Sequence, residues 1–269
     1  MSISPQAVID PTASIADDVS IGPWVQVGAD VTIGKGCQIE SHVVIHARTV
    51  LGKNNRVAAF SVLGGKPQHL SATSQNGRLL IGDHNQIHEH CVIHRGTDVS
   101  ETSTTSIGDH NCLMNHSHVA HDASIGNYVT MFSSAAIAGH VTLHDYSMIG
   151  VFCGVHQHCV VGAYSFLSRA ALVSQDVLPY LLVVYNQPKI FGLNQVGLRR
   201  KGFSSADIQL IKKAYQLILH QRLPKKELIS KLQVFSHPLL QPTIDMLAQS
   251  NRGVLLNHIS HKRSVEVEV

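Results

Sequence analysis

Three histidines and an aspartate lie close together in the segment NHSHVAHDASIGN, residues 115–127. They are His116, His118, His121 and Asp122. An imidazole can act as a general base near neutral pH, and a neighbouring carboxylate can fix its tautomer. Three neutral imidazoles can instead bind Zn²⁺ and leave a fourth position open to water. Histidines can also form hydrogen bonds in a subunit interface, so the chemistry depends on the backbone that carries these side chains.

A repeat of six residues runs through residues 1–179. Hexads such as VSIGPW, VQVGAD and VTIGKG have an aliphatic third residue, and the pattern continues to ALVSQD at residues 171–176. A period of six with a small residue after the aliphatic one predicts a short strand followed by a turn. Three hexads then form one triangular coil of a parallel β-helix, with the aliphatic side chains stacked inside. Interruptions near 67–78 and 97–104 predict two projecting loops.

The hexads stop after SQDVLPY, and residues 180–258 are predicted to form an α-helical C-terminal domain. The segment SSADIQLIKKAYQLILHQR has apolar residues at helical spacing, with Ser204 or Ser205 as candidate N-cap. Pro224 is placed to open a second helix through KKELISKLQVF, and TIDMLAQS predicts a third. The tail 259–269 is predicted to be disordered.

Composition excludes several classes of protein. No apolar run approaches the roughly 20 residues that span a bilayer, and the N-terminus MSISPQAVID has no signal-peptide character, so we expect a cytoplasmic protein without a transmembrane segment. A net charge of +3 without a basic run argues against a nucleic-acid partner. The five cysteines include no CxxC pair, which predicts reduced thiols.

The repeat places several polar side chains on one strip of the prism. In the hexad SHVAHD, Val119 is the inward residue, so its histidines face outward. One coil is three hexads long, which stacks His121 over Gly139 and Gly139 over Gln157. The outward histidines that the repeat brings to this strip are His118, His121, His140 and His156.

The same region carries very little charge. Charged residues make up 14% of the chain, where about a quarter is usual, and 19 residues are histidine. Between residues 111 and 176 the Asp, Glu, Lys and Arg residues are Asp122, Asp145, Arg169 and Asp176. A face so poor in charge is typical of a subunit interface. A three-sided prism packs naturally by cyclic threefold symmetry, so we expect a homotrimer with clefts between neighbours.

Three interpretations of the histidines remain open at this point. They form hydrogen bonds in the interface, or they bind zinc, or His121 is a general base oriented by Asp122. For zinc, the spacing from His116 to His121 is similar to that in hexapeptide-repeat carbonic anhydrases.

Five motifs favour the third interpretation. HVAHDASIGN, IAGHVTL, GVHQHCVVGA, SQDVLPY and GLRRKGFS occur in this order and together resemble the UDP-N-acetylglucosamine O-acyltransferases of lipid A biosynthesis. The resemblance runs from the first hexads to SNRGV at 250–254. It implies a left-handed parallel β-helix, which is an exception to the usual handedness of parallel crossovers. It also implies transfer of a 3-hydroxyacyl group from acyl carrier protein to the 3-hydroxyl of UDP-N-acetylglucosamine, with no cofactor.

The resemblance also implies roles for individual residues. His121 would be the base, Asp122 would orient it, and the Gly139 N–H would donate to the developing oxyanion. One base is sufficient, because a thioester carbonyl is already electrophilic and a sugar hydroxyl only needs to lose its proton. The substrate-binding residues that it implies are Gln68, His118, His140, His156, Gln157, Asn186, Arg199 and Arg200, with Lys201 as a further cation. Without the resemblance, Gly139 is a small residue in a tight coil and RRKGFS an exposed helix entry.

Four positions depart from the family pattern. In KPQHLSATSQNG, His69 and Ser71 stand where the family usually has an acid and a lysine, and Gln187 stands where a histidine is common. These changes raise the alternative of a paralogue that acylates a different UDP-sugar. Arg169 lies in the region that measures the acyl chain, where small or apolar residues are usual, so we expect a shortened or unusual acyl preference. A further alternative is a binding or scaffold protein without turnover.

Overall fold

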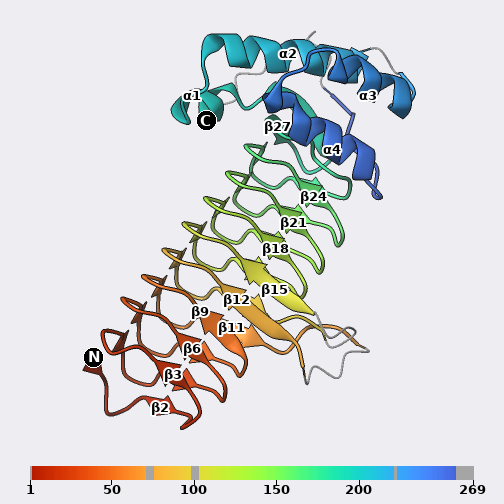
Figure 1. The fold of residues 1–269 in the computed structure, drawn as a ribbon. Coiled ribbons are helices and arrows are strands. Elements are labelled where there is room, and N and C mark those ends of the chain that lie inside the picture. Colours follow the sequence, from red (N-terminus) through yellow and green to blue (C-terminus); the bar gives the residue numbers. More distant parts are fainter. Residues whose placement is uncertain (1, 71–75, 98–102, 221–222, 259–269) are drawn as a thin grey trace.

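The chain forms a tall three-sided prism of short parallel strands with a group of helices at one end (Figure 1). The computed structural model describes residues 2–70, 76–97, 103–220 and 223–258. This architecture confirms the predicted fold class, a left-handed parallel β-helix followed by a small α-helical part. No helix in these ranges is both long and apolar enough to cross a membrane.

Each side of the prism is one sheet, and all strand pairs are parallel except β27 with β28 at the end of the first sheet. The first sheet consists of β1 (Ser2–Ile3), β4 (Ser20–Ile21), β7 (Gln38–Ile39), β10 (Arg56–Val57), β13 (Gln86–Ile87), β16 (Cys112–Leu113), β19 (Thr130–Met131), β22 (Met148–Ile149), β25 (Phe166–Leu167), β27 (Leu181–Val184) and β28 (Lys189–Leu193). The second consists of β2 (Val8–Ile9), β5 (Gln26–Val27), β8 (Val44–Ile45), β11 (Val62–Gly65), β14 (Val92–His94), β17 (His118–Val119), β20 (Ala136–Ile137), β23 (Gly154–Val155) and β26 (Leu172–Val173). The third consists of β3 (Ser14–Ile15), β6 (Thr32–Ile33), β9 (Thr49–Leu51), β12 (Arg78–Ile81), β15 (Thr104–Ile107), β18 (Ser124–Ile125), β21 (Thr142–Leu143) and β24 (Val160–Val161).

The register of the strands follows the repeat. His118 pairs with Ala136, and Ala136 with Gly154, so each coil advances by three hexads. Two loops lengthen this step: Arg56 pairs with Gln86, and Gln86 with Cys112. Both loops leave the prism after strands of the second sheet, β11 and β14, and return to the third sheet. Both therefore project from the same corner of the prism.

Aliphatic third residues fill the interior, because side chains that alternate along each short strand point inward once per hexad. Val119, Ile137 and Val155, consecutive along the second sheet, are almost wholly buried. The five cysteines are free, and burial raises the pKa of Cys91 and of Cys153 to about 11. These thiols stay protonated at neutral pH.

A ladder of buried asparagines joins the coils that precede and follow each of the two loops. The Asn55 side-chain oxygen accepts from the Asn85 side-chain amide at 3.0 Å, and the Asn85 oxygen accepts from the Asn111 backbone N–H at 2.9 Å. The Asn111 oxygen in turn accepts from the Val129 N–H at 2.7 Å. Because buried amides need partners, this ladder holds the register across both interruptions of the repeat.

The corners between sheets are left-handed turns. Residues such as Asp122, Tyr128 and His140 have φ near +57° to +58°, a region where Asp, Asn and His are enriched. Rings at successive corners stack on one another: centroids of Tyr128 and Tyr146 are 4.8 Å apart, and those of Tyr146 and Tyr164 are also 4.8 Å apart. The repeat therefore aligns corner side chains as well as core side chains.

The helical part begins later than the predicted boundary at residue 180. Leu181–Val184 and Lys189–Leu193 form an antiparallel hairpin that extends the first sheet, because the aliphatic run LLVV pairs with β25. The helices are α1 (Gln195–Arg200), α2 (Ser205–His220), α3 (Lys225–Gln233) and α4 (Gln241–Gln249), with a 3₁₀ turn at Pro238–Leu240. Ser204 caps α2: its hydroxyl accepts from the Asp207 N–H at 3.1 Å, which confirms one of the two predicted caps. The predicted disordered tail, 259–269, lies outside the described residues.

Candidate active site

A groove of about 540 Å³ runs along the outer face of the second sheet, beside the corner from which the loops project. Ala136 and Gly154 form its floor, and His118 and Leu172 continue the same row of outward side chains. Six of the residues predicted to act on substrate line it, namely Gln68, His118, His121, Gly139, His156 and Gln157. The small side chains of the floor leave room for a long, thin apolar group.

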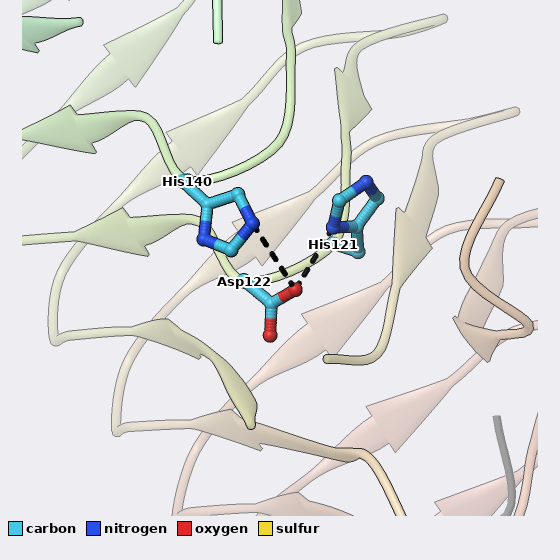
Figure 2. A group of neighbouring side chains, drawn as sticks. All are labelled: His121, Asp122 and His140. Carbon is cyan, nitrogen blue, oxygen red and sulfur yellow. Dashed lines mark hydrogen bonds and ion pairs between the residues drawn. The ribbon is translucent and has the colours of Figure 1, made fainter. Parts of the chain in front are cut away.

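His121 and Asp122 form a hydrogen-bonded pair (Figure 2), and His121 lines the groove. The distance from His121 Nδ1 to Asp122 Oδ2 is 2.9 Å, and the two side chains are 10% and 8% exposed. An ionised carboxylate only accepts hydrogen bonds, so in the neutral imidazole Nδ1 carries the proton and Nε2 has the lone pair. His121 is therefore held in the tautomer of a general base.

Two threonines hold Asp122, one through its carboxylate and one through its backbone N–H. Thr97 is the first residue of the second loop. Its hydroxyl donates to Asp122 Oδ2 at 2.9 Å, and its N–H donates to Asp122 Oδ1 at 3.1 Å. The Asp122 N–H donates to the Thr105 hydroxyl at 2.8 Å. Thr97 could not be predicted from the sequence, because only the fold brings the IHRGT segment to this corner.

His140 approaches the same carboxylate from the next coil. Its Nε2 lies 3.7 Å from Asp122 Oδ2, and its side chain is 44% exposed (Figure 2). Burial lowers the pKa of His140, and the Asp122 charge opposes this shift. The ring meets the His121 ring edge to face and stacks on His158. His140 thus supports the pair and leaves part of its ring open to a ligand.

Gly139 lies directly against the base. A Cβ on this residue would stand 2.5 Å from Cε1 and 2.8 Å from Nε2 of His121, so no larger residue fits without moving the ring. The neighbouring N–H groups of Ala138 and His140 donate to backbone carbonyls, whereas the Gly139 N–H has no acceptor among the residues that the structure describes. A free N–H beside Nε2 is a ready donor for negative charge on a ligand.

The start of the first loop also reaches the base. Gln68 lines the groove, and the His69 ring meets the His121 ring edge to face, with centroids 5.4 Å apart. His69, one of the departures from the family pattern, therefore contacts the proposed catalytic residue. Ser71, the other departure in this loop, lies outside the described residues.

Burial gives His118 a neutral ring. Burial first, and then the neighbouring His94, lower the pKa of His118 below its usual value. The rings of His94 and His118 meet edge to face at 5.2 Å. At neutral pH His118 therefore presents the groove with one donor and one acceptor rather than a charge.

Known proteins share this arrangement over nearly the whole chain. A curated protein of Syntrophobacter fumaroxidans, an acyl-[acyl-carrier-protein]–UDP-N-acetylglucosamine O-acyltransferase, is 41% identical over 258 residues, covering 95% of this chain and all of that relative. The chain belongs to the UDP-N-acetylglucosamine O-acyltransferase family. The resemblance identified in the motifs is thereby confirmed.

Family models and solved structures of UDP-N-acetylglucosamine O-acyltransferases agree with this. Residues 176–255 match the model of domain 2 of that family, and residues 30–65 match the bacterial transferase hexapeptide model. The UDP-N-acetylglucosamine acyltransferase of Francisella novicida is 36% identical with a TM-score of 0.91, covering 94% of this chain and 93% of its own. The enzyme of Moraxella catarrhalis is 37% identical, also with a TM-score of 0.91, and covers 95% and 100%.

Four of the predicted residues lie away from the groove of their own chain. Asn186 is exposed in the β27–β28 turn, where its side chain accepts from the Gln187 N–H. Arg199 and Arg200 are exposed at the end of α1, and Arg169 is exposed near the corner between the first and second sheets. Lys201, the further cation, lies over the Tyr146 ring. The groove instead ends at Leu172, which is 56% exposed and which sequence reasoning missed.

A zinc site of the carbonic anhydrase kind does not fit these positions. His116 lies at the opposite end of β17 from His121 and stacks on His90 at another corner of the prism. Among the described residues, His121, Asp122 and His140 are the group of metal-ligand side chains whose ligand atoms lie within 4.8 Å of one another. A metal ion bound to His121 through Nδ1 would have to replace the proton that this nitrogen donates to Asp122.

Proposed function

We propose that this protein transfers a 3-hydroxyacyl group from acyl carrier protein to the 3-hydroxyl of UDP-N-acetylglucosamine, the first step of lipid A biosynthesis. Its relatives are acyl-[acyl-carrier-protein]–UDP-N-acetylglucosamine O-acyltransferases. The observation that carries the proposal is the His121–Asp122 pair packed against the Gly139 backbone, at the side of a groove with an apolar floor.

The reaction needs one base and one donor for an oxyanion. The sugar hydroxyl attacks the thioester carbon while His121 Nε2 takes its proton, and Asp122 stabilises the imidazolium that forms. The carbonyl oxygen becomes an oxyanion, which accepts a hydrogen bond from the Gly139 N–H. When the C–S bond breaks, His121 returns the proton to the departing thiolate of the carrier's arm. The products are the 3-O-acylated sugar nucleotide and the free thiol.

The remaining predicted residues bind the substrates. Gln68, His118 and His140 surround the base and would contact the sugar and the acyl carbonyl, while His156 and Gln157 at the other part of the groove would contact the nucleotide and the carrier's arm. Arg199 and Arg200, exposed at the end of α1, offer a positive surface to phosphates or to an acidic carrier protein.

We further propose that three copies assemble in the cytoplasm. Large apolar side chains are exposed on the prism: Leu172, which lines the groove, is 56% exposed, and Phe152, which precedes β23, is 67% exposed. A neighbouring prism would cover them and would bring a second set of side chains to the open side of the groove. Asn186 and Arg169, which lie outside the groove of their own chain, could act on a neighbour's groove. Light scattering should then give three times the mass of one chain.

The decisive experiment is an acyl-transfer assay. The protein is incubated with UDP-N-acetylglucosamine and 3-hydroxyacyl carrier proteins of graded length, and the products are identified by mass. Transfer should occur with one or a few donors, and His121→Ala should lower kcat by about 10²–10⁴-fold. His116→Ala, at another corner of the prism, is the matched control and should keep its activity.

Other outcomes discriminate the alternatives. Because His69 contacts the base where the family usually has an acid, other UDP-sugars belong in the same panel. Transfer to one of these sugars alone would identify a paralogue with another acceptor. Binding of the carrier protein without transfer to any sugar, unchanged in His121→Ala, would indicate a scaffold protein.

A further inference from the structure

A cation from the helical part reaches the groove. Arg252 follows α4 in the sequence, yet its Nη2 lies 3.2 Å from Nδ1 of His156 and 3.2 Å from the carbonyl oxygen of Ser174. His156 and Ser174 both line the groove. The C-terminal segment thus contributes a guanidinium to the site that the prism builds.

The backbone around Arg252 is held on both sides. The Ser250 hydroxyl donates to the buried carboxylate of Asp176 at 2.6 Å. The Asp176 N–H donates to the Gly253 carbonyl at 2.9 Å, and the Leu255 N–H donates to the Asp176 carbonyl at 2.8 Å. Since these contacts precede and follow Arg252, its side chain is aimed by the fold rather than by its own flexibility.

The contact with Arg252 selects one tautomer of His156. A guanidinium has donors and no acceptor, so Nδ1 must offer a lone pair, and the proton of the ring then lies on Nε2. The Gln157 carbonyl also lies 3.3 Å from Nδ1 and would favour the opposite tautomer. The contact with Arg252 is the shorter of the two, and the guanidinium cannot lose its proton. This contact therefore determines the tautomer of His156.

We infer that Arg252 is a positioning residue that holds His156 with its Nε2–H available to an acceptor oxygen of the substrate. The inference rests on the proposed acyl transfer, in which such an oxygen belongs to the acyl donor or to the sugar nucleotide. Without Arg252, the Gln157 carbonyl captures the Nδ1–H, and Nε2 becomes an acceptor that faces another acceptor.

A double-mutant cycle tests this inference. Arg252→Ala should lower kcat/KM by about tenfold, the effect of one charge-assisted hydrogen bond, and Arg252→Lys should recover part of the loss. In a His156→Ala background, Arg252→Ala should cause no further loss, because the group that it orients is gone. Losses that multiply in the double variant would overturn the inference.

Ser250→Ala is the matched structural control. It loosens the same segment at its contact with Asp176 but leaves the arginine in place. Its melting temperature should fall while kcat/KM stays close to that of the unaltered protein. An equal loss of activity in Ser250→Ala and Arg252→Ala would show that only the anchoring of the segment matters.

A spectroscopic measurement separates this inference from the proposed function. The ¹⁵N shifts of the His156 ring, assigned by their loss in His156→Ala, should report an unprotonated Nδ1 and a protonated Nε2, and should change in Arg252→Ala. A protonated Nδ1 in the unaltered protein would refute the inference even if acyl transfer is active. Absence of transfer with the expected tautomer would instead refute the proposed function alone.

Discussion

Gly139 is needed because it has no Cβ, and not because of its backbone conformation. A Cβ at this position would stand 2.5 Å from Cε1 of His121, closer than any real contact of this kind. The ring of the base can therefore lie on the backbone and bring Nε2 beside the N–H that we propose as oxyanion donor. Glycine here serves a close approach, and its conformation places no demand on the residue type.

Gly139→Ala should consequently damage catalysis more than folding. The added methyl group displaces the His121 ring, and a displacement of about 1 Å is enough to lower kcat by about 10²-fold. Because the contact is to a side chain that can swing aside, the melting temperature should change little. An active Gly139→Ala variant would show that the ring does not work from this position.

Arg169 remains a prediction about acyl length. The side chain is exposed and does not line the groove of its own chain, so any effect on the acyl group requires a neighbouring copy. Arg169→Gly should move the preferred donor towards longer chains, measured by competition between carrier proteins of graded length. Leu172→Gly is the comparison, because Leu172 ends the groove within one chain. A shift in Leu172→Gly alone would transfer the role to that residue.

At the scale of elements, the β-helix depends on contacts between coils, because its very short strands have little stability of their own. The points most at risk are the two loops, where the step between paired strands is longer than three hexads. The buried amides of Asn55, Asn85 and Asn111 join the coils at these points. They let the site-forming loops leave the prism without loss of register.

Asn85→Ala should therefore destabilise the fold. It removes the acceptor of the Asn111 N–H and the donor to Asn55, and it leaves buried groups without partners. The free energy of unfolding should fall by about 2–4 kcal/mol, as measured by denaturant titration. Gln86→Ala, at the next and exposed position, is the control and should be nearly neutral. Equal stability of the two variants would contradict the role of the ladder.

For the whole molecule, half-buried histidines make stability depend on pH. Burial lowers the pKa of five histidines: His46, His94, His118, His140 and His144. In the unfolded chain their pKa returns to about 6.5, so the unfolded state binds more protons as pH falls. The contribution of these histidines to the free energy of unfolding is therefore present above about pH 6.5. It is lost as the pH falls through their lower pKa values in the folded protein.

The free energy of unfolding should accordingly decrease between about pH 7 and pH 5, measured by denaturant titration. His144→Gln, distant from the groove, should weaken this dependence because it removes one of the titrating groups. A stability that rises on acidification in this range would contradict the burial argument.

The sequence by itself determined the prism, the inward aliphatic residues and the family, because a six-residue period has one simple structural solution and the motifs occur at fixed places in it. It also aligned His121, Gly139 and Gln157, since an uninterrupted coil is always three hexads long. Tertiary structure alone decided which distant segments complete the site: Thr97, His69 and Arg252 come from loops and from the helical part, whose paths no repeat dictates. It also decided that residues 181–193 extend a sheet rather than a helix, because a short aliphatic run takes the form that its neighbours offer.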